Sequence, residues 1–284
     1  MIKPVYEFLL WDNCHNNCKF CFQRNKPRLF NIQKRQEILE KTINFIDSDK
    51  FIPQSHVLIV GGEIFDSLVL NEVMTAFFEK IVERMLTNRI DLLYINTNMI
   101  YKDMTVLYNM LNLIQKHNLF NRLKFTTSYD IEGRFATEET RQQMLNNLLK
   151  VKEDFKDINI VTNIILTKQC CEVILNGTFN TKEFMDKYNC WINFIPYIIY
   201  LKELTADKKD IFKALSKINR QNPGYLDRYI GSFDNGQDKY LYYYDNNDFV
   251  FCSCENSECG HAENFKRYSE DGTCFICDLK NIFD

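Results

Sequence analysis

The sequence predicts an α/β protein with parallel strands, and two observations support this fold class. Short apolar runs typical of buried strands alternate with longer segments whose apolar residues recur at helical spacing. The centres of five successive strand candidates are also evenly spaced, with steps of 35, 32, 36 and 32 residues between Leu58, Leu93, Phe125, Val161 and Asn193. A repeated βα unit of this length implies parallel strands joined by right-handed crossovers. Periodicity alone does not distinguish a doubly wound sheet from a partial barrel.

Six strands alternate with helices in the first 200 residues. The expected strands cover residues 6–11, 57–60, 92–95, 123–127, 158–165 and 191–195. Helices are expected at residues 31–47, 69–85, 106–114, 144–149 and 181–188. The pattern then changes to one more helix at 211–218 and a β-hairpin formed by 240–244 and 249–252. We therefore expect a main domain of residues 1–205 and a C-terminal extension of residues 206–284.

Composition excludes some functional classes. The chain has 284 residues, 45% of them hydrophobic, and a net charge of −3. A large nucleic-acid surface would need a basic field, so this charge argues against one, although a local basic patch is not excluded. No apolar run is long enough to span a membrane, and no secretory signal is visible at the N-terminus. We expect a cytoplasmic protein.

Eleven cysteines are many for a chain without a secretion signal, and they predict metal ligands rather than disulfides. They fall into three sets along the chain. These are Cys14, Cys18 and Cys21; Cys170, Cys171 and Cys190; and Cys252, Cys254, Cys259, Cys274 and Cys277. The middle set lacks ligand spacing, so we expect its members to be small buried apolar residues.

The first set has the spacing C-x3-C-x2-C. On a helix these three cysteines would share one apolar face, but the surrounding residues Asn13, Asn16 and Asn17 favour a turn. Three thiolates in one loop can bind a metal centre. A zinc site would need a fourth ligand, for which His15 is the nearby candidate. A 4Fe–4S cluster held by three cysteines would leave one iron open for a small molecule.

This motif, with Phe20 directly before the third cysteine, resembles the signature of the radical S-adenosylmethionine (radical SAM) enzymes. The resemblance covers about residues 5–200 and implies a partial (β/α)6 TIM-like barrel. It also implies that Cys14, Cys18 and Cys21 hold an oxygen-sensitive 4Fe–4S cluster, whose open iron binds SAM. In that family the cluster cleaves SAM reductively to a 5′-deoxyadenosyl radical, which abstracts hydrogen from the substrate.

A Gly-Gly-Glu segment follows the second expected strand, one strand after the cysteine loop. Glycines let backbone approach a ligand closely, and Glu63 can pair with an amine. The segment is similar to the family motif that binds the SAM amino group, which implies that role for Gly61, Gly62 and Glu63. The resemblance further implies SAM contacts at the ends of later strands and beside the cysteines. The residues concerned are Asn98, Ser128, Asn163 and Phe20.

Simpler roles compete with some of these expectations. The strand-end residues Asn98, Ser128 and Asn163 could instead cap the helices that follow them. Tyr129, Asp130 and Arg134 lie just beyond the fourth strand, where substrate contacts are expected, but the sequence gives them no specific role.

The third cysteine set predicts a second metal centre in the C-terminal extension. The segment is polar and unlike a packed core, and its C-x2-C pair is typical of zinc and iron–sulfur sites alike. The candidate ligands are Cys252, Cys254, Cys259, His261, Cys274 and Cys277. Zinc and an auxiliary cluster stay open at this point, as do free thiols on the tail.

Taken together, the motifs predict a radical SAM enzyme that acts on a peptide, a protein or a small molecule. A nucleotide- or RNA-modifying radical SAM enzyme is the alternative. A non-catalytic iron–sulfur or zinc protein is the alternative from another class. The resemblance also implies an electron donor of the flavodoxin or ferredoxin type.

Overall fold

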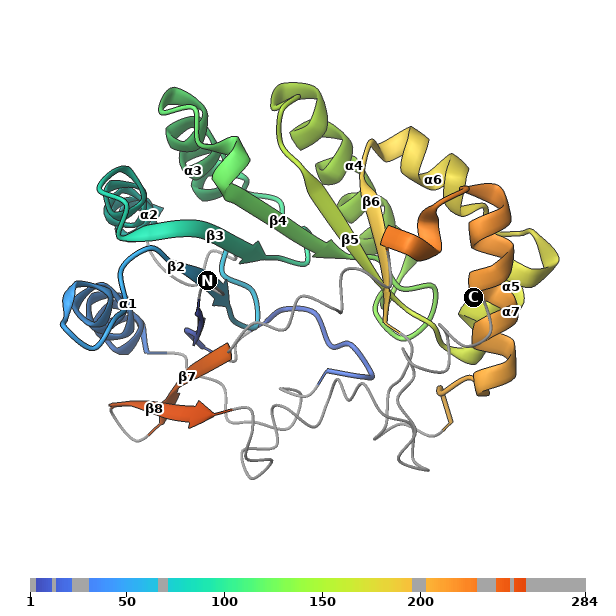
Figure 1. Cartoon of the computed structure of the whole chain (residues 1–284), viewed down its shortest axis with the longest axis horizontal. Helices are drawn as coiled ribbons and strands as arrows, with labels where there is room; N and C mark the ends of the chain where they lie inside the picture. Colours follow the sequence, from blue (N-terminus) through green and yellow to red (C-terminus); the bar gives the residue numbers. More distant parts are fainter. Residues whose placement is uncertain are drawn as a thin grey trace.

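The computed structural model describes residues 4–11, 14–21, 31–65, 71–195, 203–228, 239–245 and 248–253. These residues form a curved sheet with helices along its outer side (Figure 1). Within the described part of the chain, no helix is long and apolar enough to cross a membrane.

Six parallel strands make up most of the sheet and follow one another in chain order. They are β1 (Val5–Leu9), β2 (Ser55–Val60), β3 (Ile90–Asn96), β4 (Leu123–Ser128), β5 (Ile160–Ile165) and β6 (Trp191–Ile195). The sheet does not close on itself within the described residues, since β6 is one edge and the C-terminal hairpin the other. The predicted α/β fold is confirmed, and the open, curved arrangement is that of a partial TIM-like barrel.

Helices connect the successive strands, as the βα period predicts. They are α1 (Ile32–Asp47), α2 (Asn71–Leu86), α3 (Thr105–Lys116), α4 (Glu138–Asp154), α5 (Lys168–Asn176), α6 (Thr181–Tyr188) and α7 (Lys208–Gln221). A 3₁₀ turn, η1 (Phe120–Arg122), precedes β4. Figure 1 shows α1 to α4 on the convex side of the sheet.

Between β5 and β6 the prediction of a single helix was wrong, because two helices lie there. The missed helix, α5, is capped by Thr167, whose side chain accepts a hydrogen bond from the backbone N–H of Cys170. It ends at Gly177, whose φ of 87° suits glycine. With nine residues and two cysteines on its buried face, this helix gives only a weak periodic signal.

The two faces of the sheet have different environments, which places the core. On the outer face, Leu93, Ile95 and Phe125 are fully buried under the helices. On the inner face, alternate residues such as Tyr94 and Asn96 are only half-buried. Because side chains alternate along a strand, the core lies between sheet and helices, and the concave face carries polar groups.

A hairpin extends the sheet beyond β1. Strand β7 (Lys239–Asp245) pairs parallel to β1, and β8 (Asp248–Ser253) pairs antiparallel to β7. The sequence predicted this hairpin but not its place beside β1, where it covers a strand edge that would otherwise be unpaired. Ser253, at the end of β8, pairs with Tyr240, which in turn pairs with Tyr6 near the start of β1. The predicted division between residues 205 and 206 stays a prediction.

Candidate functional site

The cysteine loop begins directly after β1, at the edge formed by the carboxyl ends of the parallel strands. Functional groups gather at this edge in βα folds. The backbone N–H of Leu10 donates to the carbonyl of Val60 at 3.0 Å, and that of Gly62 donates to the carbonyl of Trp11 at 2.7 Å. These bonds tie the start of the cysteine loop to the segment that follows β2. The structure therefore places the two predicted motifs side by side.

Gly61 is needed where these two segments meet. A Cβ at this position would lie 3.1 Å from the carbonyl oxygen of Trp11 and 3.1 Å from Cγ2 of Ile64. A side chain would thus push the two segments apart. The indole N–H of Trp11 also donates to the carbonyl of Glu63 at 3.1 Å, which fixes the segment from the other side.

The Glu63 carboxylate is buried, with 1% of the residue exposed. Its Oε1 accepts from the Phe65 backbone N–H at 3.0 Å and from the Thr97 hydroxyl at 2.7 Å, and its Oε2 accepts from the Asn98 backbone N–H at 2.6 Å. Burial raises the pKa of Glu63 to about 6, although these three donors oppose the rise. Among the described residues, no Lys or Arg forms an ion pair with it. A buried carboxylate in this state suits a cationic ligand.

Asn98 connects this carboxylate to the cysteine loop. Its backbone N–H binds Glu63, and its side-chain Nδ2 donates to the Sγ of Cys14 at 3.3 Å. Its Oδ1 accepts from the backbone N–H of Ile100 at 2.7 Å, so the side chain is held in place. The helix-capping alternative does not describe these bonds, since Asn98 precedes α3 by several residues and Met104 occupies the cap position. The expected contact of Asn98 with SAM stays a prediction.

Nitrogen donors hydrogen-bond two of the three sulfur atoms of the loop. Cys14 Sγ also accepts from the backbone N–H of Asn16 at 3.3 Å, and Cys18 Sγ accepts from the Asn16 side chain at 3.3 Å. Cys18 is buried, whereas Cys14 and Cys21 are partly exposed. Burial raises the pKa of Cys14 to about 12 and raises that of Cys18 as well, so metal binding must displace protons from these thiols.

The donor set of the loop fits an iron–sulfur cluster, whose usual ligands are thiolates. In the described part of the chain, no three Cys, His, Asp or Glu side chains are close enough to hold one metal ion. The zinc alternative with His15 stays open. Hydrogen bonds from nitrogen to sulfur are also a normal part of cluster sites.

Arg134 is a site residue for which the sequence predicted no role. Its guanidinium pairs with Asp130, and its Nη1 donates to Cys18 Sγ at 3.7 Å. It also lies over the ring of Phe20, 5.2 Å from the centroid. Asp130 is 1% exposed, and its other oxygen accepts from the backbone N–H of Ile165 at 2.6 Å. Their position after β4 was the only signal in the sequence.

Phe20 is buried in a small apolar cluster at this site. The cluster also contains Cys18, Ile165 and Leu204, and Cys21 packs against it. The backbone beside Phe20 is fixed, because the N–H of Lys19 donates to the carbonyl of Gly133 at 2.7 Å. The expected contact of Phe20 with SAM stays a prediction.

Ser128 and Asn163 lie opposite each other on β4 and β5, on the concave face of the sheet. Both are half-buried. Asn193 on β6 extends the row, and its Nδ2 donates to Asn163 Oδ1 at 3.0 Å. No hydrogen bond within the described ranges joins this row to the cysteine loop, so its SAM contacts stay predictions. The row forms a polar strip on the inner wall of the barrel.

The other two cysteine sets have different outcomes. Cys170, Cys171 and Cys190 are buried, which confirms the prediction that they pack as small apolar residues. Of the second-site candidates, only Cys252 lies in a described element, β8. The others lie outside the described residues, namely Cys254, Cys259, His261, Cys274 and Cys277.

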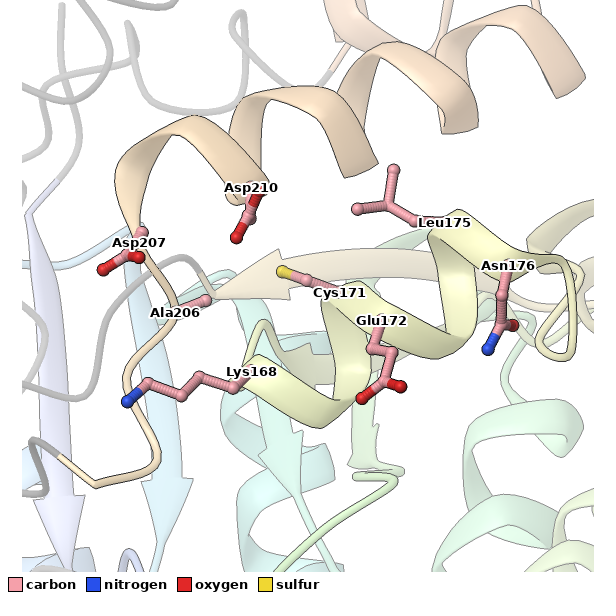
Figure 2. A pocket seen from close by; sticks show the side chains of 8 residues that line it. All are labelled: Lys168, Cys171, Glu172, Leu175, Asn176, Ala206, Asp207 and Asp210. Carbon is pink, nitrogen blue, oxygen red and sulfur yellow. The ribbon is translucent and has the colours of Figure 1, made fainter.

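A pocket of about 580 Å³ lies between α5 and α7, away from the predicted site residues. Figure 2 shows the side chains from the two helices and from the segment before α7. They are Lys168, Cys171, Glu172, Leu175, Asn176, Ala206, Asp207 and Asp210. Three of the eight lining residues are acidic, and the lining contains none of the residues that the motifs predict.

Comparison with known proteins gives matches in structure only. No family model matches the sequence, and no curated protein matches it. Native anSMEcpe with bound AdoMet, which is S-adenosylmethionine, aligns with a TM-score of 0.52 at 14% sequence identity. The same protein with AdoMet and the Cp18Cys peptide gives 0.51 at 15%, and with AdoMet and the Kp18Cys peptide 0.50 at 15%.

Each of these alignments covers 82% of this chain and 62% of the anSMEcpe chain. The chain thus spans about three fifths of the length of the structures that it matches. At this level of identity the likeness shows the fold alone, which this chain shares with anSMEcpe. The shared fold agrees with the partial barrel that the resemblance implied.

Proposed function

We propose that this protein is a radical SAM enzyme. One observation supports this most directly: three thiols in one loop, two of which accept N–H donors at sulfur, lie beside a Gly-Gly-Glu segment at the carboxyl ends of parallel strands. Cys14, Cys18 and Cys21 would hold a 4Fe–4S cluster, and Gly61, Gly62 and Glu63 would bind the amino-acid end of SAM. When bound, these cofactors supply hydrogen-atom abstraction through a 5′-deoxyadenosyl radical, while the protein positions the reactants and excludes water.

The residues of the chain have distinct tasks in this proposal. The buried Glu63 carboxylate offers negative charge to the SAM ammonium, and the Asn98 side chain holds Cys14 in place. Phe20 covers the loop from the apolar side. Ser128 and Asn163 face the concave side of the sheet, where they can contact the rest of SAM or the substrate.

For the substrate we propose a peptide or protein, with a small molecule as the alternative. The strip of Asn163 and Asn193 offers amide donors and acceptors, which match a peptide backbone. The anSMEcpe structures include peptide-bound forms. The net charge of −3 speaks against a nucleic-acid substrate.

Three further predictions belong to the same proposal. The cysteine-rich extension would hold a second metal centre, either zinc or an auxiliary cluster. A flavodoxin- or ferredoxin-like protein would supply electrons. A reducing, cytoplasmic location would suit the free thiols.

The test compares two triple variants after anaerobic reconstitution with iron and sulfide. Replacing Cys14, Cys18 and Cys21 with Ala should remove about four irons per chain, the complement of a 4Fe–4S cluster, and abolish SAM cleavage under dithionite. The matched control replaces Cys170, Cys171 and Cys190 with Ala, which removes the same number of thiols. We expect it to keep its iron and its SAM cleavage. Unchanged SAM cleavage in the first variant would contradict the proposal, and iron binding without SAM cleavage in the wild type would favour a non-catalytic iron–sulfur protein.

A further inference from the structure

Arg134 is the one cationic side chain of the described residues that hydrogen-bonds a sulfur of the cysteine motif. Its Nη1 lies 3.7 Å from Cys18 Sγ, although the two residues are 116 positions apart in the sequence. The side chain is only 14% exposed. A hydrogen bond from a charged donor in a buried setting is electrostatically stronger than one in water.

Two contacts hold the guanidinium in this position. Asp130 pairs with its Nε, and Asp130 is itself fixed by the backbone N–H of Ile165. The Phe20 ring lies against the guanidinium, 5.2 Å from its centroid. The protein's own contacts therefore direct the Arg134 charge at Cys18, which is the condition for acting on a cluster without reorganisation.

The backbone beside Arg134 also holds the segment after β4 against the cysteine loop. Gly133 has a φ of 81° and accepts a hydrogen bond from the N–H of Lys19 at 2.7 Å. A Cβ on Gly133 would lie 3.3 Å from the Phe20 ring. The segment after β4 is thus docked on the cysteine loop by backbone as well as side-chain contacts.

The charge of Arg134 would affect the reduction potential of a cluster. On one-electron reduction a cluster gains one negative charge, and a nearby cation stabilises that reduced form. Net charge, hydrogen bonds to sulfur and solvent exposure set the reduction potential of iron–sulfur clusters. At Cys18, Arg134 contributes a positive charge and a hydrogen bond to sulfur.

Building on the proposed function, we propose that Arg134 is a positioning residue that raises the reduction potential of the cluster held by Cys14, Cys18 and Cys21. Asp130 orients the guanidinium, and Cys18 receives its hydrogen bond. The competing possibility is that Arg134 only anchors the segment after β4 through Asp130. An anchor would affect folding and cluster retention but would leave the potential of a retained cluster unchanged.

The experiment is a redox titration of the reconstituted protein, followed by electron paramagnetic resonance of the reduced cluster. It is done without SAM, so that any effect on SAM binding does not contribute. In Arg134→Gln we expect the equilibrium for reduction to become about tenfold less favourable, which for one electron corresponds to a potential about 59 mV lower. Iron content measured in parallel shows whether the cluster is retained.

Arg141→Gln is the matched control. Arg141 also pairs with a carboxylate, Glu138 at 3.0 Å, and lies over an aromatic ring, 5.7 Å from the Phe135 centroid, but it hydrogen-bonds no cysteine of the described ranges. The reduction potential of the cluster in Arg141→Gln should equal that in the wild type. If Arg134→Gln does not fold or does not retain a cluster, Arg134→Lys takes its place. Lysine has one nitrogen, which Asp130 would occupy, so we expect a smaller shift in the same direction.

The outcomes separate this inference from the proposed function. A lower potential in the Arg134 variant, with an unchanged potential in the control, supports the inference. A wild-type potential in the Arg134 variant overturns it and leaves the proposed function intact, because the cluster is still present. A wild-type protein that forms no 4Fe–4S cluster overturns both.

Discussion

Replacing Glu63 with Gln tests the proposed SAM site with the smallest change of shape. The buried carboxylate affects the stability of the fold in two ways, through its charge and through its hydrogen bonds. The substitution to Gln changes these two contributions in opposite directions. Its pKa is raised from 4.5 to about 6 by burial, which corresponds to a cost of about 2 kcal/mol when it is charged. The folded protein binds a proton at Glu63 more tightly than the unfolded chain does. The cost to folding is therefore absent below pH 4.5, where the carboxyl is protonated in both states, and complete above about pH 6, where it is charged in both. Gln removes it.

Gln also removes one hydrogen-bond acceptor. If the amide oxygen keeps the two bonds from Phe65 and Thr97, the new NH₂ group faces the backbone N–H of Asn98. Leaving that buried donor unpaired costs about 1–3 kcal/mol. The two effects nearly cancel, so we expect the stability of the folded chain to change by less than about 2 kcal/mol.

Binding of SAM should respond far more than stability does. A hydrogen bond between two charged groups is worth about 1.5–3 kcal/mol, so its loss weakens affinity about ten- to 150-fold. The assay is calorimetric titration of SAM into the cluster-loaded protein under anaerobic conditions. Iron content and visible absorption must match those of the wild type, so that a lower affinity is not caused by cluster loss.

Two results would refute the reasoning on Glu63. A wild-type affinity for SAM would show that the carboxylate is not its partner. Loss of the cluster together with SAM binding would show that Glu63 acts mainly by holding Asn98 and, through it, Cys14.

The remaining predictions concern the cysteine loop and the C-terminal extension. Gly61→Ala should lower the iron content and destabilise the fold by about 1–3 kcal/mol, because its Cβ would press on Trp11 and Ile64; unchanged iron and unfolding midpoint would contradict this. The second metal centre is tested by metal analysis of the variant that lacks Cys14, Cys18 and Cys21. Residual iron with sulfide indicates an auxiliary cluster, one residual zinc indicates a structural site, and absence of both metals contradicts the prediction.

The parts of the fold that depend on local pattern could be predicted from the sequence. All six parallel strands were expected close to their observed positions, because apolar runs and their spacing are local properties. Helix α5 was missed, since its buried face is short and partly made of Cys170 and Cys171. The hairpin was expected from its turn and flanking residues, but its pairing with β1 depends on a contact between chain segments more than 200 residues apart.

The candidate site likewise combines motifs that are local in the sequence with contacts between residues that are far apart in it. The cysteine motif and the Gly-Gly-Glu segment are each a short continuous stretch of sequence, so their resemblance to the motifs of a family could be seen without the structure. The contacts around them are not contiguous. Asn98 bonds Cys14 across 84 positions, and Arg134 bonds Cys18 across 116.

The sequence by itself therefore determined the fold class, the cysteine loop as the centre of the site and the neighbouring position of Gly61, Gly62 and Glu63. Only the tertiary structure decided that Glu63 is buried under three donors and that Arg134 is aimed at Cys18. The physical reason is that ligand spacing is set by covalent neighbours along the chain. The charge, burial and hydrogen bonds of a site are instead set by side chains that different strands bring to one edge of the sheet.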